Sequence, residues 1–324
     1  MLRFITFILA MSVFGNLALQ ANAAAPMVQA QVPGYYRYQL GQFEITALHD
    51  GKMELDAQLL NNINAQEVEQ LTGRMFAGYP KIQGTVNAYL VNTGAHLVLV
   101  DAGASKAFNP NLGNLLDNMR AAGYTPAQVD TILLTHLHPD HVGALTDADG
   151  KPVFTNARIY TAKAESDYWL DKDAAQAAPA SAQPMYITAQ TATAPYITTG
   201  QWQPFAEGGT LVPGIKPVAA YGHTPGHTGY EVESEGQTMF IWGDVVHVHS
   251  VQFARPGVAI AFDVDQNMAV ATRLSIMKKM ASDKAIVAGM HLPFPGIGHV
   301  RMDAQDSYSW IPVEYSPMLD RNEN

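Results

Sequence analysis

The chain has 324 residues, of which 48% are hydrophobic, and it carries 29 acidic against 19 basic residues for a formal net charge of −10. This length and composition allow a large buried core, in one big α/β domain or two smaller ones. No long block of Lys or Arg occurs, and phosphate binding needs clustered cations, so we expect no nucleic-acid partner. The chain has no Cys, which excludes disulfides and thiolate metal ligands.

Residues 1–24 have the pattern of a bacterial secretory signal peptide. Arg3 precedes an apolar stretch over 4–19, and Ala21 and Ala23 form an A-x-A cleavage pattern. An uncleaved membrane anchor is the alternative, but the apolar run is short and is interrupted by Asn16. We therefore expect a single mature domain over 25–324, located in the periplasm or outside the cell and without contact to the membrane.

Apolar patterns and turn residues predict an alternation of strands and helices in two similar halves. Asp50-Gly51, Asn92-Thr93-Gly94 and Glu235-Gly236 indicate hairpin turns. The predicted strands are, in chain order, 43–48, 86–91, 96–100, 131–135, 215–220, 230–233, 239–242 and 285–288. This alternation indicates two sheets packed face to face and covered by helices on the outside.

Two segments are predicted to be amphipathic helices. The first covers 111–122, and the second covers 267–280 with Met268, Ala271, Leu274 and Met277 on its apolar face. Between the two halves, residues 172–199 are rich in Ala, Gln, Thr and Pro, and we expect a mobile insertion there, in part helical.

The run THLHPDH at 135–141 is the most informative motif, because it packs four metal-ligand side chains behind a buried strand. His136 and His138 are two residues apart, so in extended backbone both side chains project to one side and can hold one ion. Pro139 suits the first turn of a helix, from which Asp140 and His141 leave in another direction. The spacing therefore predicts two adjacent metal positions.

Further ligand candidates follow other predicted strands. His223 lies in a Gly- and Pro-rich turn, and Asp244 and His291 each follow an apolar strand, where an unpaired carboxylate would be costly to bury. His227 and Asp101 are candidates for an outer shell that orients the ligands. The remaining histidines considered are expected to have ordinary structural roles, namely His49, His96 and His299.

The motifs LVDAG at 99–103, THLHPDH, GHTPGHT at 222–228 and Gly243-Asp244 resemble those of the metallo-β-lactamase superfamily. The stretches PGYYR, FEITALHDG, YLVNTG and HLPFPGIGH are similar to its methyl parathion hydrolase branch. The resemblance implies a four-layer αβ/βα sandwich with a dinuclear metal site. It implies that His136, His138 and His223 hold one metal, that Asp140, His141 and His291 hold the other, and that Asp244 bridges both.

This ligand set is free of thiolate and suits Zn²⁺, although Mn²⁺, Co²⁺ or Fe would tolerate it. Two cations sharing one water would make a bridging hydroxide available as the nucleophile, which indicates hydrolysis. Asp140 and Asp244 are the candidate catalytic proton carriers. The alternative outside enzymology is a metal-binding module, which is disfavoured because structural zinc sites are normally closed four-ligand cages.

Three residues bear on the substrate. Related lactonases carry a Tyr three positions after the bridging Asp, whereas this chain has His247, and Ile260 and Phe262 add bulk to the expected pocket. We take these residues to favour small-molecule esters, namely aromatic lactones such as dihydrocoumarin and aryl esters. The alternatives are an organophosphate triester hydrolase of the methyl parathion type and an N-acyl homoserine lactonase. The family also implies a homodimer.

Overall fold

The computed structural model describes residues 25–206 and 208–317. The predicted signal peptide, residues 1–24, lies outside these ranges. Within them, no helix is both long and apolar enough to cross a membrane. The chain divides into two units, 1–32 and 33–324. Residues 25–32 of the first unit are exposed and carry no helix or strand, so the description below concerns the second unit.

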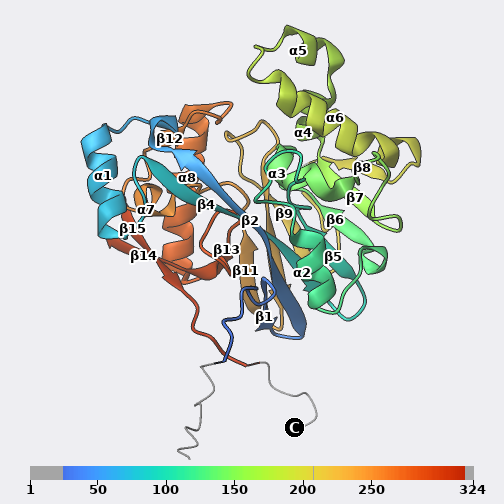
Figure 1. Ribbon diagram of the computed structural model, residues 1–324, viewed down its shortest axis with the longest axis horizontal. Helices are drawn as coiled ribbons and strands as arrows, with labels where there is room; N and C mark the ends of the chain where they lie inside the picture. Colours follow the sequence, from blue (N-terminus) through green and yellow to red (C-terminus); the bar gives the residue numbers. More distant parts are fainter. Residues whose placement is uncertain (1–24, 207, 318–324) are drawn as a thin grey trace, which may run out of the picture. The chain divides into compact units, whose positions relative to one another are not determined.

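The first sheet of this unit has seven strands in the order β1-β2-β4-β5-β6-β7-β8 (Figure 1). The first four pair antiparallel, and β5 to β8 pair parallel. The predicted hairpin around 92–94 is the β4–β5 pair. The strands are β1 (Tyr35–Leu40), β2 (Phe43–Asp56), β4 (Lys81–Asn92), β5 (Leu97–Val100), β6 (Thr131–Leu133), β7 (Arg158–Ala162) and β8 (Trp202–Phe205).

The second sheet has six strands in the order β15-β14-β13-β11-β10-β9. The predicted hairpin about Glu235-Gly236 is the β10–β11 pair, and β11 and β13 run parallel. Its strands are β9 (Ile215–Ala219), β10 (Thr228–Ser234), β11 (Gln237–Ile241), β13 (Ile286–Ala288), β14 (Ile297–Ala304) and β15 (Ser307–Pro312). A small third sheet pairs β3 (Leu60–Asn61) with β12 (Ala259–Ile260).

The helices of the described part of the chain are short except for two. They are α1 (Ala65–Arg74), α2 (Leu115–Ala121), α3 (Pro139–Val142), α4 (Lys163–Leu170), α5 (Lys172–Ala177), α6 (Gln183–Thr198), α7 (His249–Gln252) and α8 (Gln266–Asp283), together with the 3-10 turns η1 (Ala57–Leu59), η2 (Pro126–Gln128) and η3 (Gly143–Leu145). Figure 1 shows α2, α4 and α6 beside the first sheet and α8 beside the second.

Three buried clusters define the layers. Side chains of both sheets, such as Val98 and Leu133 facing Tyr230 and Ile241, form the cluster between the sheets. A second cluster joins the first sheet to α2, α4 and α6, and a third joins the second sheet to α8. Because each sheet is buried on both faces, the order of layers is helix, sheet, sheet, helix. The predicted four-layer sandwich of the metallo-β-lactamase fold is confirmed.

The turn predicted at Asp50-Gly51 is wrong, because β2 continues through it to Asp56 with a bulge between His49 and Gly51. The bulge turns Asp50 inward, where its carboxylate accepts hydrogen bonds from the backbone N–H groups of Ala104, Gly113 and Leu115 at 3.0 to 3.1 Å. Asp50-Gly51 is a dipeptide common in hairpin turns, but in this protein it forms a bulge whose Asp50 side chain anchors the loop that follows β5.

The helices predicted at 111–122 and 267–280 exist, but their details differ. The first is confined to α2 and does not include residues 111–114. Gly113 has a φ of +80°, which is incompatible with a right-handed helix, so the helix begins only after Asn114. The second is longer, and α8 buries Ala269, Arg273, Met277 and Met280, whereas Met268 is 46% exposed. Of the predicted apolar face, Met277 is buried as expected, whereas Met268 and Ala271 are exposed, and Arg273 is buried where the pattern led us to expect a polar surface residue.

The segment 172–199 is more helical than its composition indicated. It contains α5 and the 16-residue α6, which begins with Pro184 in its first turn. Tyr186, Ala189 and Tyr196 of α6 are buried in the cluster against the first sheet. Whether this segment moves stays a prediction.

Candidate metal centre

The THLHPDH motif occupies the junction that the sequence predicted. β6 ends at Leu133, and α3 begins with Pro139 at its first position. His138 precedes the helix with φ −67° and ψ 156°, an extended conformation that the following proline favours. The change from extended to helical backbone at this point separates the two His136/His138 imidazoles from the Asp140/His141 pair.

The first group of donors consists of His136, His138, His223 and Asp244, all buried and with ligand atoms within 4.8 Å of one another. Nε2 of His223 lies 3.2 Å from Nε2 of His136 and 3.0 Å from Nδ1 of His138. The same nitrogen lies 3.3 Å from Oδ2 of Asp244. Three imidazoles from two distant loops therefore face one point beside a carboxylate.

The second group consists of Asp140, His141 and His291. Oδ2 of Asp140 lies 3.6 Å from Nε2 of His141 and 3.5 Å from Nε2 of His291. Asp244 reaches this group as well, with its Oδ1 3.3 Å from His141 Nε2 and its Oδ2 3.0 Å from His291 Nε2. Asp244 is thus the one carboxylate in contact with both groups among the described residues.

Outer partners orient four of the imidazoles. Nδ1 of His141 lies 2.7 Å from Asp101, Nδ1 of His223 lies 2.8 Å from Asp263, and Nδ1 of His291 lies 2.7 Å from the carbonyl oxygen of Thr85. Nδ1 of His136 lies 3.0 Å from the hydroxyl of Thr135, which itself donates to Asp101. Each Nδ1 is used outward, so each Nε2 faces the centre and is the nitrogen that a metal ion would bind in place of a proton.

Converging lone pairs repel one another unless a cation lies between them, so these donors fit a metal ion better than they fit one another. Nε2 of His141 and Oδ1 of Asp244 are buried without a hydrogen-bond partner, which is costly in a protein interior. Imidazole and carboxylate donors without thiolate suit divalent cations of the Zn²⁺ kind. The chemistry of the donor set therefore supports two divalent metal ions.

The electrostatics of the centre agree with this fit. Burial lowers the pKa of His136 and of His138 well below the ordinary histidine value, so both imidazoles are neutral and offer lone pairs. Burial acts in the same direction on His223, but hydrogen bonds to Asp244 and Asp263 outweigh it and raise the pKa of His223 to about 9. The carboxylates that attract a proton to this point attract a metal cation for the same reason.

His227 lies just outside the donor groups, where the sequence placed it. Its Nδ1 donates to the carbonyl oxygen of Ala220 at 2.8 Å, and its Nε2 accepts from the backbone N–H of Asp244 at 2.9 Å. Burial lowers the pKa of His227 to about 3, in keeping with a neutral ring that both donates and accepts. This side chain positions the backbone that carries Asp244.

Gly243 makes room for this contact. Its φ is +63°, and a Cβ at this position would lie 2.4 Å from Nε2 of His227. We expect Gly243→Ala to lower the free energy of unfolding by about 1 to 3 kcal/mol and to weaken metal binding, as measured by chemical denaturation and metal content. Gly257→Ala is the matched control, because a Cβ there meets nothing within 4 Å. Equal metal content in both variants would contradict this reading.

Asp101 holds His141 and has a positive φ of 60°, which is unusual for a residue other than glycine. We expect Asp101→Asn to weaken the binding of the metal at His141 by about 10- to 100-fold, measured by competition with a chelator. Asp50→Asn is the control, because Asp50 is also buried but bonds only to backbone N–H groups. A metal affinity reduced equally in both variants would argue against a specific role of Asp101.

Several groups that orient the ligands were missed at the level of sequence, among them Asp263 and the backbone carbonyl of Thr85. Asp263 orients His223. It directly follows the apolar residues Ala261 and Phe262, and an acidic residue next to apolar ones was the only indication in the sequence that this carboxylate could be buried. The backbone carbonyl of Thr85 has no sequence signal, since any residue supplies one. The three histidines predicted to be structural lie elsewhere; for example, His299 contacts the carbonyl oxygen of Ala285.

The three residues predicted to shape the pocket lie in different surroundings. Nε2 of His247 is 3.0 Å from Oδ2 of Asp244, and the His247 ring stacks on His291. The Phe262 ring stands edge-on to His247, with centroids 5.0 Å apart. Ile260 is fully buried in β12, in a cluster with Leu55, Leu60, Val68 and Val251. His247 and Phe262 are therefore adjacent to the donors, and the role of all three toward a substrate stays a prediction.

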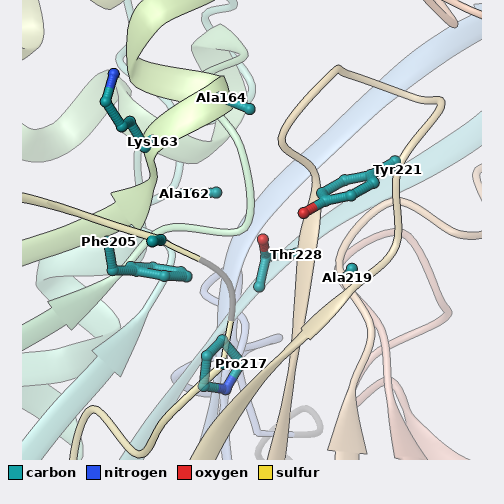
Figure 2. A pocket seen from close by; sticks show the side chains of 10 residues that line it. Ala162, Lys163, Ala164, Phe205, Pro217, Ala219, Tyr221 and Thr228 are labelled. Carbon is teal, nitrogen blue, oxygen red and sulfur yellow. The ribbon is translucent and has the colours of Figure 1, made fainter.

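A cavity of about 320 Å³ lies between the start of α4 and the second sheet (Figure 2). Lys163, Phe205, Pro217, Tyr221 and Thr228 are among the residues that line it. The lining residues that the structure describes include none of the seven metal donors.

Comparison with known families agrees with the geometry. Residues 82–305, more than half of the chain, match the metallo-beta-lactamase superfamily. The chain belongs to this superfamily. A solved structure described as hydrolase AbOPH of the beta-lactamase superfamily is 41% identical, with a TM-score of 0.85 over 89% of this chain and 100% of that one. AidC, a dizinc quorum-quenching lactonase solved with its product, is 28% identical, with a TM-score of 0.80 over 88% of this chain and 99% of that one.

Curated relatives match over shorter stretches. The atrochrysone carboxyl ACP thioesterase of Passalora fulva is 35% identical over 120 residues, covering 35% of this chain and 33% of that protein. The lactamase-like protein adaB of Aspergillus niger is 34% identical over 112 residues, covering 33% of each chain. The chain thus spans about a third of the length of these relatives. Together with the solved structures, these matches support membership of the metallo-beta-lactamase superfamily, and the proteins compared include a hydrolase, a dizinc lactonase and a thioesterase.

Proposed function

We propose that this superfamily hydrolase uses a dinuclear centre, loaded with Zn²⁺, to open lactones and to cleave aryl esters, with small aromatic lactones such as dihydrocoumarin preferred. The observation that carries the proposal is the convergence of seven donors around Asp244, which contacts both the group of His136, His138 and His223 and the group of Asp140, His141 and His291. A third possible set of ligands, Asp244, His247 and His291, overlaps these two groups. A closed structural zinc site needs only four protein ligands, so a shared carboxylate between two groups favours a catalytic centre over a metal-binding module.

The residues named for the two metals follow the two groups of donors. His136, His138 and His223 would hold one ion, Asp140, His141 and His291 the other, and Asp244 would contact both. When bound, two divalent ions polarise a carbonyl oxygen and lower the pKa of water, which supplies a nucleophile near neutral pH. The protein contributes the orientation of the donors and a site from which bulk water is largely excluded.

Asp140 and Asp244 are proposed to handle protons. The Asp140 side chain is 10% exposed, so its Oδ2 can accept a proton from water and return it to solvent. The Asp244 side chain is only 2% exposed and lies between imidazoles, so its proposed part is to take up at Oδ2 the proton that the attacking water loses and to deliver it to the leaving oxygen. His247 contacts the same oxygen and orients it.

The proposed preference for flat acyl substrates rests on the wall beside the donors. The rings of His247 and Phe262 stand at 77° to each other, and Phe262 also meets the edges of His138 and His223. A planar ester or aromatic lactone can lie against such rings, whereas a tetrahedral phosphotriester needs more width. AidC, which is a lactonase, supports lactone opening as the reaction class.

A substrate panel tests the proposal. The Zn²⁺-loaded mature protein would be assayed with dihydrocoumarin, an N-acyl homoserine lactone, an aryl acetate and methyl paraoxon. We expect the highest kcat/KM for dihydrocoumarin and substantial activity on the aryl acetate. A highest kcat/KM for methyl paraoxon would instead support the methyl parathion hydrolase branch, and a highest value for the homoserine lactone would support a quorum-quenching lactonase.

Two further proposals concern the setting of the enzyme. We propose that it is exported to the periplasm or beyond, on the strength of the leader pattern in residues 1–24. We also propose a homodimer, which the resemblance implies. Fractionation of cells expressing the full chain and sedimentation of the purified protein would test these two proposals.

A further inference from the structure

A buried carboxylate outside the seven donors links the loops that carry them. Glu165 of α4 is fully buried. Its Oε1 accepts hydrogen bonds from the backbone N–H of Leu137 at 3.0 Å and from Nε1 of Trp169 at 2.6 Å. Its Oε2 accepts from the backbone N–H of Gly226 at 2.9 Å. All three partners are N–H groups that donate, and an ionised carboxylate can only accept, so the Glu165 carboxylate suits this position.

The backbone donors belong to the two loops that hold the first group of ligands. Leu137 stands between His136 and His138, and Gly226 follows His223 by three residues. One loop leaves β6 of the first sheet, and the other joins β9 to β10 of the second sheet. Backbone contact between the loops exists at their base, where Thr228 N–H donates to Thr135. Glu165 adds a second connection between the loops, because its carboxylate bonds both Gly226 and Leu137, the residue between His136 and His138.

Close packing supports this link. A Cβ on Gly226 would lie 2.3 Å from the backbone nitrogen of Glu165, so the loop rests directly on the first turn of α4. Figure 2 shows that turn, with Ala162 to Ala164, facing Thr228 across the cavity. Trp169, one turn further along, packs its ring edge-on to His138 with centroids 5.2 Å apart. The same short helix therefore contacts both loops and one of the ligand rings.

We propose that Glu165 is a positioning residue of the metal centre, whose carboxylate keeps His136, His138 and His223 at the mutual distances that one metal ion requires. It touches neither substrate nor metal, and it acts through Leu137, Gly226 and Trp169. The inference rests on the proposed dinuclear centre. It predicts that metal affinity, and not only folding stability, depends on this side chain.

Glu165→Gln tests the proposal, because the amide group would turn a donor toward an N–H that needs an acceptor. Zn²⁺ affinity would be measured on metal-free full-length protein by competition with a chromophoric chelator. We expect the dissociation constant for Zn²⁺ to rise about tenfold. We also expect the visible absorption of the Co²⁺-loaded variant to change in position or intensity, since that spectrum reports the arrangement of the ligands.

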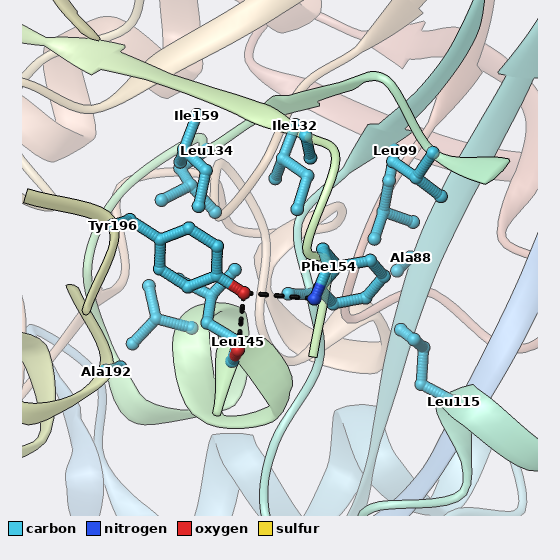
Figure 3. Close-up of a cluster of buried hydrophobic side chains, with 14 of the residues drawn as sticks. Ala88, Leu99, Leu115, Ile132, Leu134, Leu145, Phe154, Ile159, Ala192 and Tyr196 are labelled. Carbon is cyan, nitrogen blue, oxygen red and sulfur yellow. Dashed lines mark hydrogen bonds between the residues drawn. The ribbon is translucent and has the colours of Figure 1, made fainter. Parts of the chain in front are cut away.

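Tyr196→Phe is the matched control. Tyr196 is also fully buried, and its hydroxyl accepts from Phe154 N–H at 3.1 Å and donates to the carbonyl oxygen of Leu145 at 2.7 Å (Figure 3). Loss of the Tyr196 hydroxyl removes hydrogen bonds from α6 to Phe154 and Leu145. Unlike the loss of the Glu165 carboxylate, it leaves the hydrogen bonds of Leu137 and Gly226 in place. We expect this variant to lose thermal stability while its Zn²⁺ affinity and Co²⁺ spectrum stay as in the original protein.

Trp169→Phe covers the case in which Glu165→Gln does not fold. It removes one donor to Glu165 and keeps an aromatic ring beside His138, and we expect a rise of about threefold in the Zn²⁺ dissociation constant. Unchanged affinity and spectrum in the folded Glu165 variant, or in Trp169→Phe where only that variant folds, would overturn the inference. Failure of the original protein itself to bind Zn²⁺ would overturn the proposed function, and this inference with it.

Discussion

Replacing Asp244 by Asn is expected to reduce kcat/KM by roughly a thousandfold or more and to lower the metal content from two ions per chain to one or fewer. Oδ1 of this residue faces His141, and Oδ2 faces His223 and His291. An amide keeps the shape but loses the negative charge and turns an NH₂ group toward one set of donors. Steady-state kinetics and elemental analysis of the purified variant measure both effects.

Asp117→Asn is the control for this substitution. The Asp117 side chain is 73% exposed and pairs with Arg120 on the surface of α2, so the same chemical change there should alter neither quantity. A variant of Asp244 that keeps two metal ions and the original kcat/KM would show that this carboxylate does not hold the centre together.

Removing the metal is expected to abolish hydrolysis and to lower the melting temperature by roughly 10 °C. A ligand present at a thousand times its dissociation constant stabilises a folded protein by about 4 kcal/mol, and about 1 kcal/mol shifts the melting temperature of a domain of this size by roughly 2 °C or more. Without a cation, Nε2 of His223 lies 3.2 Å from Nε2 of His136 and 3.0 Å from Nδ1 of His138, and no metal ion holds these nitrogens in place. Calorimetry and activity assays after dialysis against a chelator measure the two effects.

Addition of Zn²⁺ to the metal-free protein should restore both activity and melting temperature. Addition of Mg²⁺ at the same concentration should restore neither, because five imidazoles are poor ligands for a cation that prefers oxygen. Full activity of protein shown to be free of metal would refute metal-dependent hydrolysis.

The donors could be predicted from the sequence because their local signals are strong. His136, His138, Asp140 and His141 lie within six residues, and His223, Asp244 and His291 follow apolar strands that deliver side chains to one sheet edge. The order of layers could be predicted from the alternation of strands and helices and from the resemblance to a known superfamily. These features depend on neighbours in the sequence, and no knowledge of tertiary contacts is needed to see them.

The features that sequence missed depend on contacts between distant residues. Asp263 orients His223 across 40 positions, and Glu165 bonds to Gly226 across 61. Arg273 is buried in α8 because its guanidinium donates to the carbonyl oxygens of Val245, Pro256 and Val258. A hydrophobic pattern cannot show that backbone carbonyl groups elsewhere in the chain are placed to accept hydrogen bonds from a guanidinium group, so the burial of Arg273 was missed.

Seven side chains are proposed to hold two metal ions, with Asp244 between them. A crystal structure of the Zn²⁺-loaded protein, with an anomalous difference map recorded at the zinc absorption edge, tests this arrangement. The map should show two peaks, one beside His136, His138 and His223 and the other beside Asp140, His141 and His291. A map with no peak at these side chains, or with two peaks that Asp244 does not touch, would contradict the claim.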